Sequence, residues 1–256
     1  MILDRFRLTD RVAIVTGAGR GIGEGCALAF AEQGADVVCA ARTPAQLEAI
    51  AEKIRKLGRR ALVVPCDVNE PGALEALVDR TVAEFGRIDI VVNNAGGTPP
   101  RGALQTSDRM FEAAFHFNVT TAFTLSRHAI PHMQKAGSGS IVNISSAAGR
   151  VPQANFVAYG TAKAALSFMT RQLAAEFAPV VRVNAIAVGA VKTSALMPFL
   201  NDDLRQAMEK LTPMKRLGEV EDIATMALYL ASPASSWVTG KVFEVDGGTE
   251  ATNWPS

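Results

Sequence analysis

Short apolar runs alternate along this chain with segments of helical length, and this rhythm constrains the fold more than any other feature. Seven runs qualify as candidate strands, at residues 12–16, 36–41, 61–65, 88–93, 140–145, 180–187 and 241–245. Most are continuous in Val, Ile and Ala, a pattern typical of strands that are buried on both faces of a parallel sheet. The sequence therefore predicts an α/β fold in which helices cover both faces of a doubly wound, seven-stranded parallel sheet.

The segments between the candidate strands carry helix signals. A glycine ends each of the predicted helices 21–33, 44–57 and 70–85, as is common at helix C-termini. No linker-like or repetitive segment divides the chain, so we expect residues 1–256 to form a single domain. In residues 193–217, apolar and polar residues are interleaved between two strands, and we expect this insertion to be a lid over a substrate.

The composition excludes several classes of protein. The chain has 26 basic and 25 acidic residues, and the basic ones are scattered, which argues against a nucleic-acid partner and favours a small molecule. The three cysteines are odd in number and lack CxxC spacing, so we expect reduced thiols and a cytoplasmic location. No apolar run approaches the roughly 18 residues that a membrane helix needs, and we expect no membrane partner.

The first candidate strand leads directly into a turn rich in glycine. Gly17, Gly21 and Gly23 follow it at GxxxGxG spacing, a variant of the dinucleotide fingerprint. Glycine permits a tight turn and a close approach to a pyrophosphate, and the following helix offers N–H groups and its positive dipole end. An ordinary strand-to-helix turn also favours glycine and remains the alternative.

The end of the second candidate strand indicates which nucleotide is bound. NAD usually calls for an acidic residue there to hold the ribose hydroxyls, whereas this strand ends with Ala41 and Arg42. Arg20, inside the glycine turn, can approach the same place. Two cations suit a 2′-phosphate, so we expect NADP rather than NAD. The alternative is that both arginines are solvated surface charges.

Further motifs follow the fourth and fifth strands and open a later helix. From about Leu8 to Gly248, the chain resembles the short-chain dehydrogenase/reductase family in its common form, a single NAD(P)-binding Rossmann domain. The matching motifs are TGxxxGIG at 16–23, Cys66-Asp67-Val68, NNAG at 93–96, Asn118, Ser146, Tyr159 with Lys163, and Asp246-Gly247-Gly248.

The resemblance implies a catalytic set for hydride transfer between a nicotinamide and a carbonyl or alcohol carbon. Tyr159 would transfer the proton, and Ser146 would orient the substrate oxygen. Lys163 would bind the nicotinamide ribose and lower the tyrosine pKa, and Asn118 would hold a water in a proton relay. Ser145 would point to the other face of its strand and is the lesser candidate.

The resemblance also implies the residues of the cofactor cleft. Asp67 and Val68 would flank the adenine, Asn94 would stabilise the strand edge, and Val191 would offer backbone groups to the carboxamide. The full set is Gly17, Arg20, Gly21, Ile22, Gly23, Arg42, Asp67, Val68, Asn94, Ala95, Gly96, Tyr159, Lys163, Gly189, Val191 and Thr193. Val188 stands where the family commonly has proline, and we expect a less rigid turn there without loss of activity.

Tyr159 and Lys163 also have a physical reason to act together. They are four residues apart and therefore neighbours on one helix face. A tyrosine pKa of about 10 must fall by roughly 2–3 units for acid–base work near neutrality. An ammonium at about 4 Å supplies that only where the effective dielectric is near 20, so the pair needs a sheltered cleft. A bare Tyr–Lys pair is otherwise plain helix surface.

Other signals point to no additional site. His128 and His132 share a helix face, but Pro131 lies between them and no third ligand is evident, so we expect no metal. The sequence lacks a GxSxG strand-to-helix elbow, which argues against a serine hydrolase.

Three functions remain open. The leading one is an NADP-dependent alcohol dehydrogenase or carbonyl reductase, with a likeness to the hydroxysteroid dehydrogenase branch that suits an apolar lid. A 3-oxoacyl-carrier-protein reductase is the runner-up. A catalytically silent NADP(H)-sensing binding protein is the alternative of another class, although the four catalytic positions are all occupied. The resemblance further implies a homotetramer. Trp254, near the end of the chain, would either reach a neighbouring subunit or fray.

Overall fold

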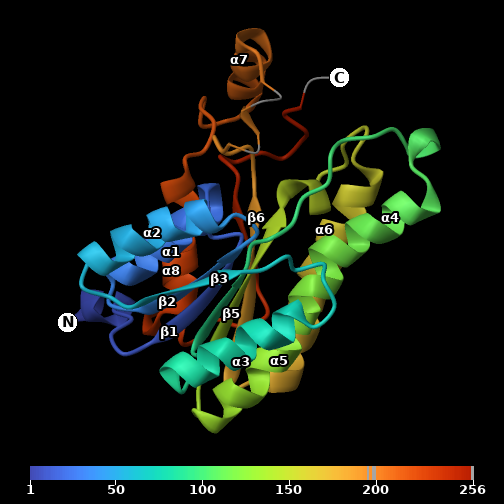
Figure 1. Ribbon diagram of the computed structural model, residues 1–256. Coiled ribbons are helices and arrows are strands. Elements are labelled where there is room, and N and C mark those ends of the chain that lie inside the picture. The colour runs from blue at the N-terminus through green and yellow to red at the C-terminus, as the bar shows by residue number, and fades with distance from the viewer. Residues whose placement is uncertain (195, 198–199, 255–256) are drawn as a thin grey trace.

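A twisted sheet of seven parallel strands is the centre of the computed structural model, which describes residues 1–194, 196–197 and 200–254 (Figure 1). The strands are β1 (Val12–Thr16), β2 (Asp36–Ala41), β3 (Ala61–Pro65), β4 (Ile90–Asn93), β5 (Gly139–Ser146), β6 (Val181–Val188) and β7 (Val242–Val245). Their order in space is β3-β2-β1-β4-β5-β6-β7, so the winding reverses between β1 and β4. The predicted doubly wound parallel sheet is confirmed.

The predicted bounds hold for the first three strands and shift slightly in the other four. β4 begins at Ile90 rather than residue 88, although the Asp89 backbone already bonds to Val12 and Ser140, and the Asp89 side chain adds further contacts. Its carboxylate accepts the Val12 N–H at 3.0 Å and pairs with Arg11. β5 and β6 each run one residue further than expected, since Ser146 is in register with Val188.

Helices cover both faces of the sheet, as Figure 1 shows. They are α1 (Gly21–Glu32), α2 (Pro44–Lys56), α3 (Ala73–Phe85), α4 (Asp108–Phe115), α5 (Thr121–Lys135), α6 (Val157–Phe177), α7 (Asp202–Leu211) and α8 (Val220–Ala231). None of the helices in the described ranges has the length and apolarity that a bilayer-spanning helix needs.

Side chains of β1 alternate between two apolar cores. Ala13 and Val15 pack with α1, α2 and α8, whereas Val12 and Ile14 pack with α3 and α5. This alternation follows from the two-residue period of a strand. A continuous apolar sequence therefore fills both sides, and the carboxyl ends of the strands are left as the place where loops can build a site.

The predicted lid contains a helix of its own. Within residues 193–217, Asn201 caps α7 by accepting the Leu204 N–H at 2.8 Å. Figure 1 shows α7 standing beyond one end of the sheet, next to the C-terminus. Residues 195, 198 and 199 of this segment lie outside the described residues.

Candidate active site

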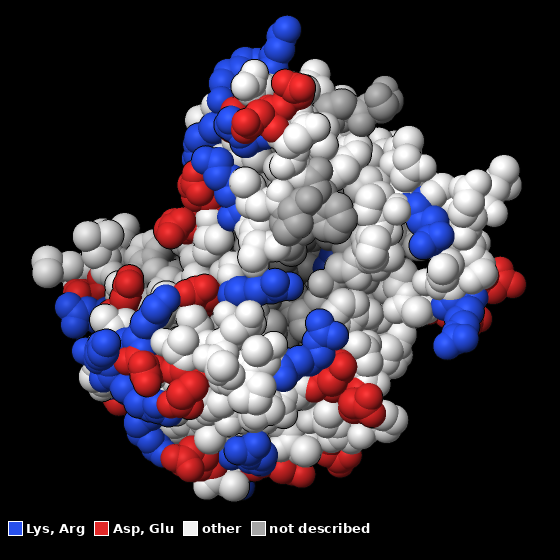
Figure 2. All heavy atoms as spheres, turned by 45° about the horizontal axis from the view of Figure 1, so that its top comes forward, with Lys and Arg blue, Asp and Glu red and all other residues white. Residues whose placement is uncertain are grey.

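A cleft of about 710 Å³ opens at the carboxyl ends of the strands. Its walls come from the turns after β1, β2, β4, β5 and β6, and it spans the point where the winding of the sheet reverses. This is where open α/β sheets bind ligands. Figure 2 shows a hollow in this face with basic side chains at its border.

The turn after β1 is packed so closely that only glycine fits it. Gly17 and Gly21 have φ of 64° and 59°, and a Cβ on Gly17 would lie 2.6 Å from Nδ2 of Asn94. A Cβ on Gly23 would lie 2.3 Å from the Gly17 carbonyl oxygen. Asn94 Nδ2 donates to the Thr16 carbonyl at 2.9 Å and to the Gly17 carbonyl at 3.3 Å, and so ties β4 to the turn. Backbone N–H groups at the start of α1 are thereby left facing the cleft.

The side chains at the far end of the cleft are mainly cationic. Arg20 and Arg42 line it, are exposed, and form no ion pair with any carboxylate of the described residues. Asp67 is the one acidic residue that the described lining contains, and its Oδ1 accepts the backbone and side-chain N–H groups of Asn69, both at 3.0 Å. The charge at this end therefore suits an anion.

Ser146 and Ser145 point to opposite sides of β5, as the strand period predicts. Ser146 lines the cleft, and its Oγ accepts the Ala148 N–H at 3.2 Å, so its own hydrogen remains available for donation. Ser145 Oγ instead donates to the Lys163 carbonyl at 3.0 Å and lies 2.8 Å from Ser167 Oγ. Ser146 is thus the serine that a substrate can contact, and Ser145 fixes α6 to the sheet.

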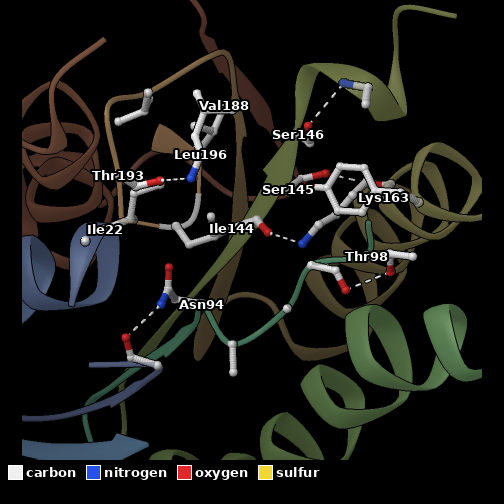
Figure 3. Close-up of a pocket in the computed structure, with 18 of the residues that line it drawn as sticks. Ile22, Asn94, Thr98, Ile144, Ser145, Ser146, Lys163, Val188, Thr193 and Leu196 are labelled. Atoms are coloured by element: carbon white, nitrogen blue, oxygen red, sulfur yellow. Dashed lines mark hydrogen bonds between the residues drawn. The ribbon is translucent and has the colours of Figure 1, made fainter. Parts of the chain in front are cut away.

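Lys163 reaches from α6 under the floor of the cleft. Its Nζ donates to the Ile144 carbonyl at 2.8 Å (Figure 3). The same Nζ lies 5.7 Å from the centre of the Tyr159 ring. The residue is only 4% exposed, and burial lowers its pKa to about 8. The ammonium is consequently held by a backbone oxygen next to the phenol and loses its proton more readily than an exposed lysine.

The pKa of Tyr159 differs from the sequence-based expectation. We expected Lys163 to lower it, but burial raises it above the ordinary value, and the opposing effect is a hydrogen bond with Ser146. The reason is desolvation, because the phenol is packed at the wall of the cleft and burial disfavours its charged form. In this structure Tyr159 is held as the neutral phenol, a proton donor.

Asn118 stands behind the cleft wall rather than in it. It lies in a π-helical turn, His116–Thr120, where its Nδ2 donates to the Ala114 carbonyl at 2.8 Å. Its Oδ1 accepts the Gly97 N–H at 2.8 Å. A Cβ on Gly96 would lie 2.8 Å from Asn118 Oδ1 and 3.2 Å from Lys163 Nζ, so both polar atoms border the space on the side of Gly96 that a Cβ would occupy. Such π-turns are frequent at functional sites.

The turn after β6 starts at Val188, the position where the family commonly has proline, and backbone hydrogen bonds hold it there. Val188 is the last residue of β6 and is in register with Val245, and the Gly189 N–H donates to the Val245 carbonyl at 3.1 Å. Further on, Ala190 and Lys192 pair with Gly218, which leaves the backbone groups of Val191 outside that pairing. The expectation of a less rigid turn stays a prediction.

Nearly all of the predicted site residues meet in this cleft. Those that line it are Gly17, Arg20, Gly21, Ile22, Arg42, Asp67, Val68, Asn94, Ala95, Gly96, Ser146, Tyr159, Lys163, Gly189, Val191 and Thr193. Gly23 and Asn118 support it from behind.

The sequence-based set missed several residues of the wall. They include Gln46, Thr98, Phe117, Phe156, Leu196, Met208, Asn253 and Trp254. Phe156 had a usable signal, since it lies three residues before Tyr159 at the start of the same helix. Trp254 had none, because nothing local shows where a terminal segment returns.

Comparison with known proteins agrees with this geometry. A family described as enoyl-(acyl carrier protein) reductase matches residues 17–250. The 7α-hydroxysteroid dehydrogenase of Escherichia coli K12 is 39% identical over 247 residues, covering 96% of each chain. An uncharacterized oxidoreductase of Mycobacterium tuberculosis is 53% identical over 255 residues, covering 99% of this chain and 97% of the relative.

A solved structure is also similar over almost the whole chain. It is a 7α-hydroxysteroid dehydrogenase complexed with NADH and 7-oxo glycochenodeoxycholic acid, with a TM-score of 0.94 and 39% identity, covering 96% of this chain and 97% of that one. The chain therefore belongs to the short-chain dehydrogenase/reductase family, as the motifs predicted. It is an oxidoreductase that interconverts alcohols and ketones.

Proposed function

We propose that this protein is an NADP-dependent oxidoreductase that interconverts a secondary alcohol and a ketone, with Tyr159 as the acid–base group. The carrying observation is that Tyr159 and Ser146 line the same cleft, whose other end is a glycine turn with two arginines that pair with no carboxylate of the described residues. Proton donor, oxygen-binding hydroxyl and anion-binding turn thus belong to one continuous cavity.

The cleft fits a nicotinamide nucleotide. Gly17 and Gly96 line the cleft, and neither has room for a Cβ, so backbone without side chains borders the cleft at these two places. The N-terminus of α1 and the turn after β1 would hold the pyrophosphate, and Asp67 and Val68 would hold the adenine. When bound, the nucleotide supplies or accepts the hydride. The similar solved enzyme carries NADH, so the choice of the phosphorylated form depends on this chain's own residues.

Arg20 and Arg42 support NADP. Both side chains are exposed at the cleft border and lack a carboxylate partner among the described residues, so neither must break an ion pair to bind a phosphate. A charge-assisted hydrogen bond contributes about 1.5–3 kcal/mol, which corresponds to roughly tenfold to a hundredfold in affinity. The absence of an acidic residue at Ala41 or Arg42 removes the usual partner of the NAD ribose.

Tyr159 and Ser146 would perform the proton chemistry. In ketone reduction the carbonyl carbon gains a hydride, and its oxygen gains the proton that the Tyr159 hydroxyl donates; alcohol oxidation reverses both. Ser146 donates a hydrogen bond to the same oxygen and orients it. The raised pKa of Tyr159 keeps the phenol protonated at neutral pH, which favours reduction. The oxidation rate should accordingly rise with pH as the phenol ionises.

Lys163 and Asn118 would return the proton to Tyr159. The buried Lys163 ammonium, whose pKa is lowered to about 8, exchanges protons near physiological pH. Asn118 Oδ1 borders the same space beside Gly96 as Lys163 Nζ, and Asn118 would hold a water next to the ammonium.

The test is oxidation of NADPH, followed at 340 nm, with steroid ketones, cyclic ketones, acetoacetyl thioesters and small aldehydes. We expect turnover of an apolar ketone, and Tyr159→Phe should lower kcat by about 10²–10⁴ while the variant still binds NADPH. Preference for the acetoacetyl thioester would instead identify a 3-oxoacyl-carrier-protein reductase. Tight NADPH binding without any turnover would contradict the proposal and favour a nucleotide sensor.

The protein is further proposed to be a cytoplasmic homotetramer. Phe123 on α5 and Phe168 on α6 are 42% and 58% exposed, which is much apolar surface for helix faces in water. Pairing of these faces between copies would bury both residues. Light scattering after size exclusion measures the mass directly, and a monomer would contradict the assembly.

A further inference from the structure

Three aromatic side chains form a row at the substrate end of the cleft. The Phe156 ring lies edge-to-face with Tyr159, at 6.1 Å between centres, and edge-to-face with Trp254, at 5.7 Å. All three residues line the cleft, and Phe156 and Trp254 are half-buried. We call Phe156 and Trp254 the aromatic wall. It extends the cleft away from the phenol that would transfer the proton.

The C-terminal segment that carries Trp254 is anchored next to the catalytic strand. Arg150 lies one residue beyond the short helix Ala147–Gly149, which follows Ser146. Its guanidinium donates to the Thr249 carbonyl at 2.6 Å and pairs with the carboxylates of Glu244, Asp246 and Glu250, at 2.9–3.1 Å. The Asp246 side chain is only 4% exposed, so its ion pair with Arg150 is less screened by water than a pair on the surface. The tail is thus fixed relative to Ser146.

A second set of contacts joins the tail to the segment after α7. Asn253 Nδ2 donates to Thr212 Oγ1 at 2.9 Å, and the Met214 N–H donates to the Gly247 carbonyl at 3.2 Å. Thr212 is 3% exposed, so the contact is sheltered from water. These contacts place Trp254 against the cleft of its own chain, whereas a contact with a neighbouring subunit stays a prediction.

Other apolar residues line the same cleft as the aromatic wall. Leu196, Met208, Pro99 and Pro100 line the same cleft with apolar groups. A ligand between apolar walls gains binding free energy by burying apolar surface. A rigid ligand gains most, because it loses few internal rotations on binding. A short acyclic ketone can reach Tyr159 but offers little surface that extends along the row to Trp254.

We propose that Trp254 is a specificity-determining residue that, with Phe156, packs against the fused or cyclic apolar ring of the alcohol or ketone substrate. The inference rests on the proposed function, since it names the substrate class of that site. Trp254 takes no part in the proton transfer, because its contact with Tyr159 is made through Phe156. Its removal therefore weakens binding of ring-bearing substrates and leaves the chemical step intact.

The kinetic experiment compares Trp254→Ala with Trp237→Ala, using 2-decalone as a cyclic ketone and 2-butanone as an acyclic one. Trp237 is the matched control, because it is 99% exposed and does not line the cleft. We expect Trp254→Ala to raise KM for 2-decalone about tenfold, or about 1.4 kcal/mol, with kcat within about twofold and butanone kinetics unchanged. Trp254→Phe should recover most of the loss. Equal effects on both ketones, or no effect, would overturn the proposal.

A fluorescence experiment separates this inference from the proposed function. The chain has two tryptophans, so Trp237→Phe leaves Trp254 as the only one. We expect its emission to change saturably when 2-decalone is added to the NADP-loaded protein, and not when 2-butanone is added. That change without turnover of any ketone would retain the aromatic wall and reject the proposed function. Turnover of 2-decalone without a change in Trp254 emission would retain the proposed function and reject the aromatic wall.

Discussion

The two ends of the cleft are built in different ways. At the nucleotide end, consecutive residues of one turn supply the backbone groups, and Asn94 fastens that turn from the neighbouring strand. At the substrate end, the walls come from the loop after β4, the start of α6, the segment between β6 and α8, and the C-terminal tail. One end depends on backbone geometry fixed by close packing, and the other depends on side chains gathered from distant parts of the chain. A single substitution should therefore cause a large loss of ligand affinity at the nucleotide end and a smaller loss at the substrate end.

Lys163 lies between the two ends, and its burial gives the largest effect on stability. The folded pKa is about 8 against an ordinary 10.5, so between these values the unfolded chain holds a proton that the folded chain has released. Stability therefore rises with pH across that window, by about 3 kcal/mol for this group. Urea unfolding at pH 7.5 and pH 10 measures it. Lys163→Met should lack this increment, and identical pH dependence in parent and variant would contradict the burial of the charge.

Gly17 tests whether crowding, rather than φ alone, defines the nucleotide end. A Cβ there meets Asn94 Nδ2, whereas Gly58, with a similar φ of 75°, has nothing within 4 Å. Alanine at either position costs about 1–2 kcal/mol for the left-handed backbone. Gly17→Ala should in addition weaken NADPH binding by about tenfold or more, since the turn must shift away from Asn94. NADPH affinities are measured by fluorescence titration. Equal affinities in the two variants would contradict the claim that close packing defines the nucleotide end.

Arg42 tests the charge at the nucleotide end. Arg42→Ala should lower the preference for NADPH over NADH by about tenfold to a hundredfold, because a charge-assisted bond to the 2′-phosphate is lost. The expected change lies in NADPH affinity alone. Arg109→Ala is a control that removes an exposed arginine on α4 without touching the cleft. Parallel losses for NADPH and NADH would show that Arg42 does not distinguish them.

Arg150 tests whether a substitution at the substrate end causes only a small change in stability and in KM. Arg150→Met leaves three carboxylates without their shared cation, but the guanidinium is about one-third exposed, so we expect only about 1 kcal/mol of lost stability. KM for 2-decalone should rise about twofold to threefold as the tail loosens, with little change in NADPH affinity. Arg60→Met, which removes an ion pair with Glu84 away from the cleft, is the matched control. A large loss of NADPH binding in Arg150→Met would contradict the separation of the two ends.

The sequence predicted the sheet and the nucleotide end well. Strands buried on both faces have a continuous apolar signature, and the glycine turn is a local pattern in consecutive residues. The same holds for Tyr159 and Lys163, which share one helix face because of their spacing. Asn118 was named only through the family resemblance, and its place behind Gly96 follows from a π-turn that spacing does not reveal.

What the sequence by itself determined is which local structures form, because hydrophobic period and turn chemistry act between near neighbours. The tertiary structure decided where Lys163 directs its proton, which way the pKa of Tyr159 moves, and that Trp254 lines the cleft of its own chain. Each of these depends on burial and on partners that are far away in sequence. Desolvation and packing are set by the whole fold, so no local pattern encodes them.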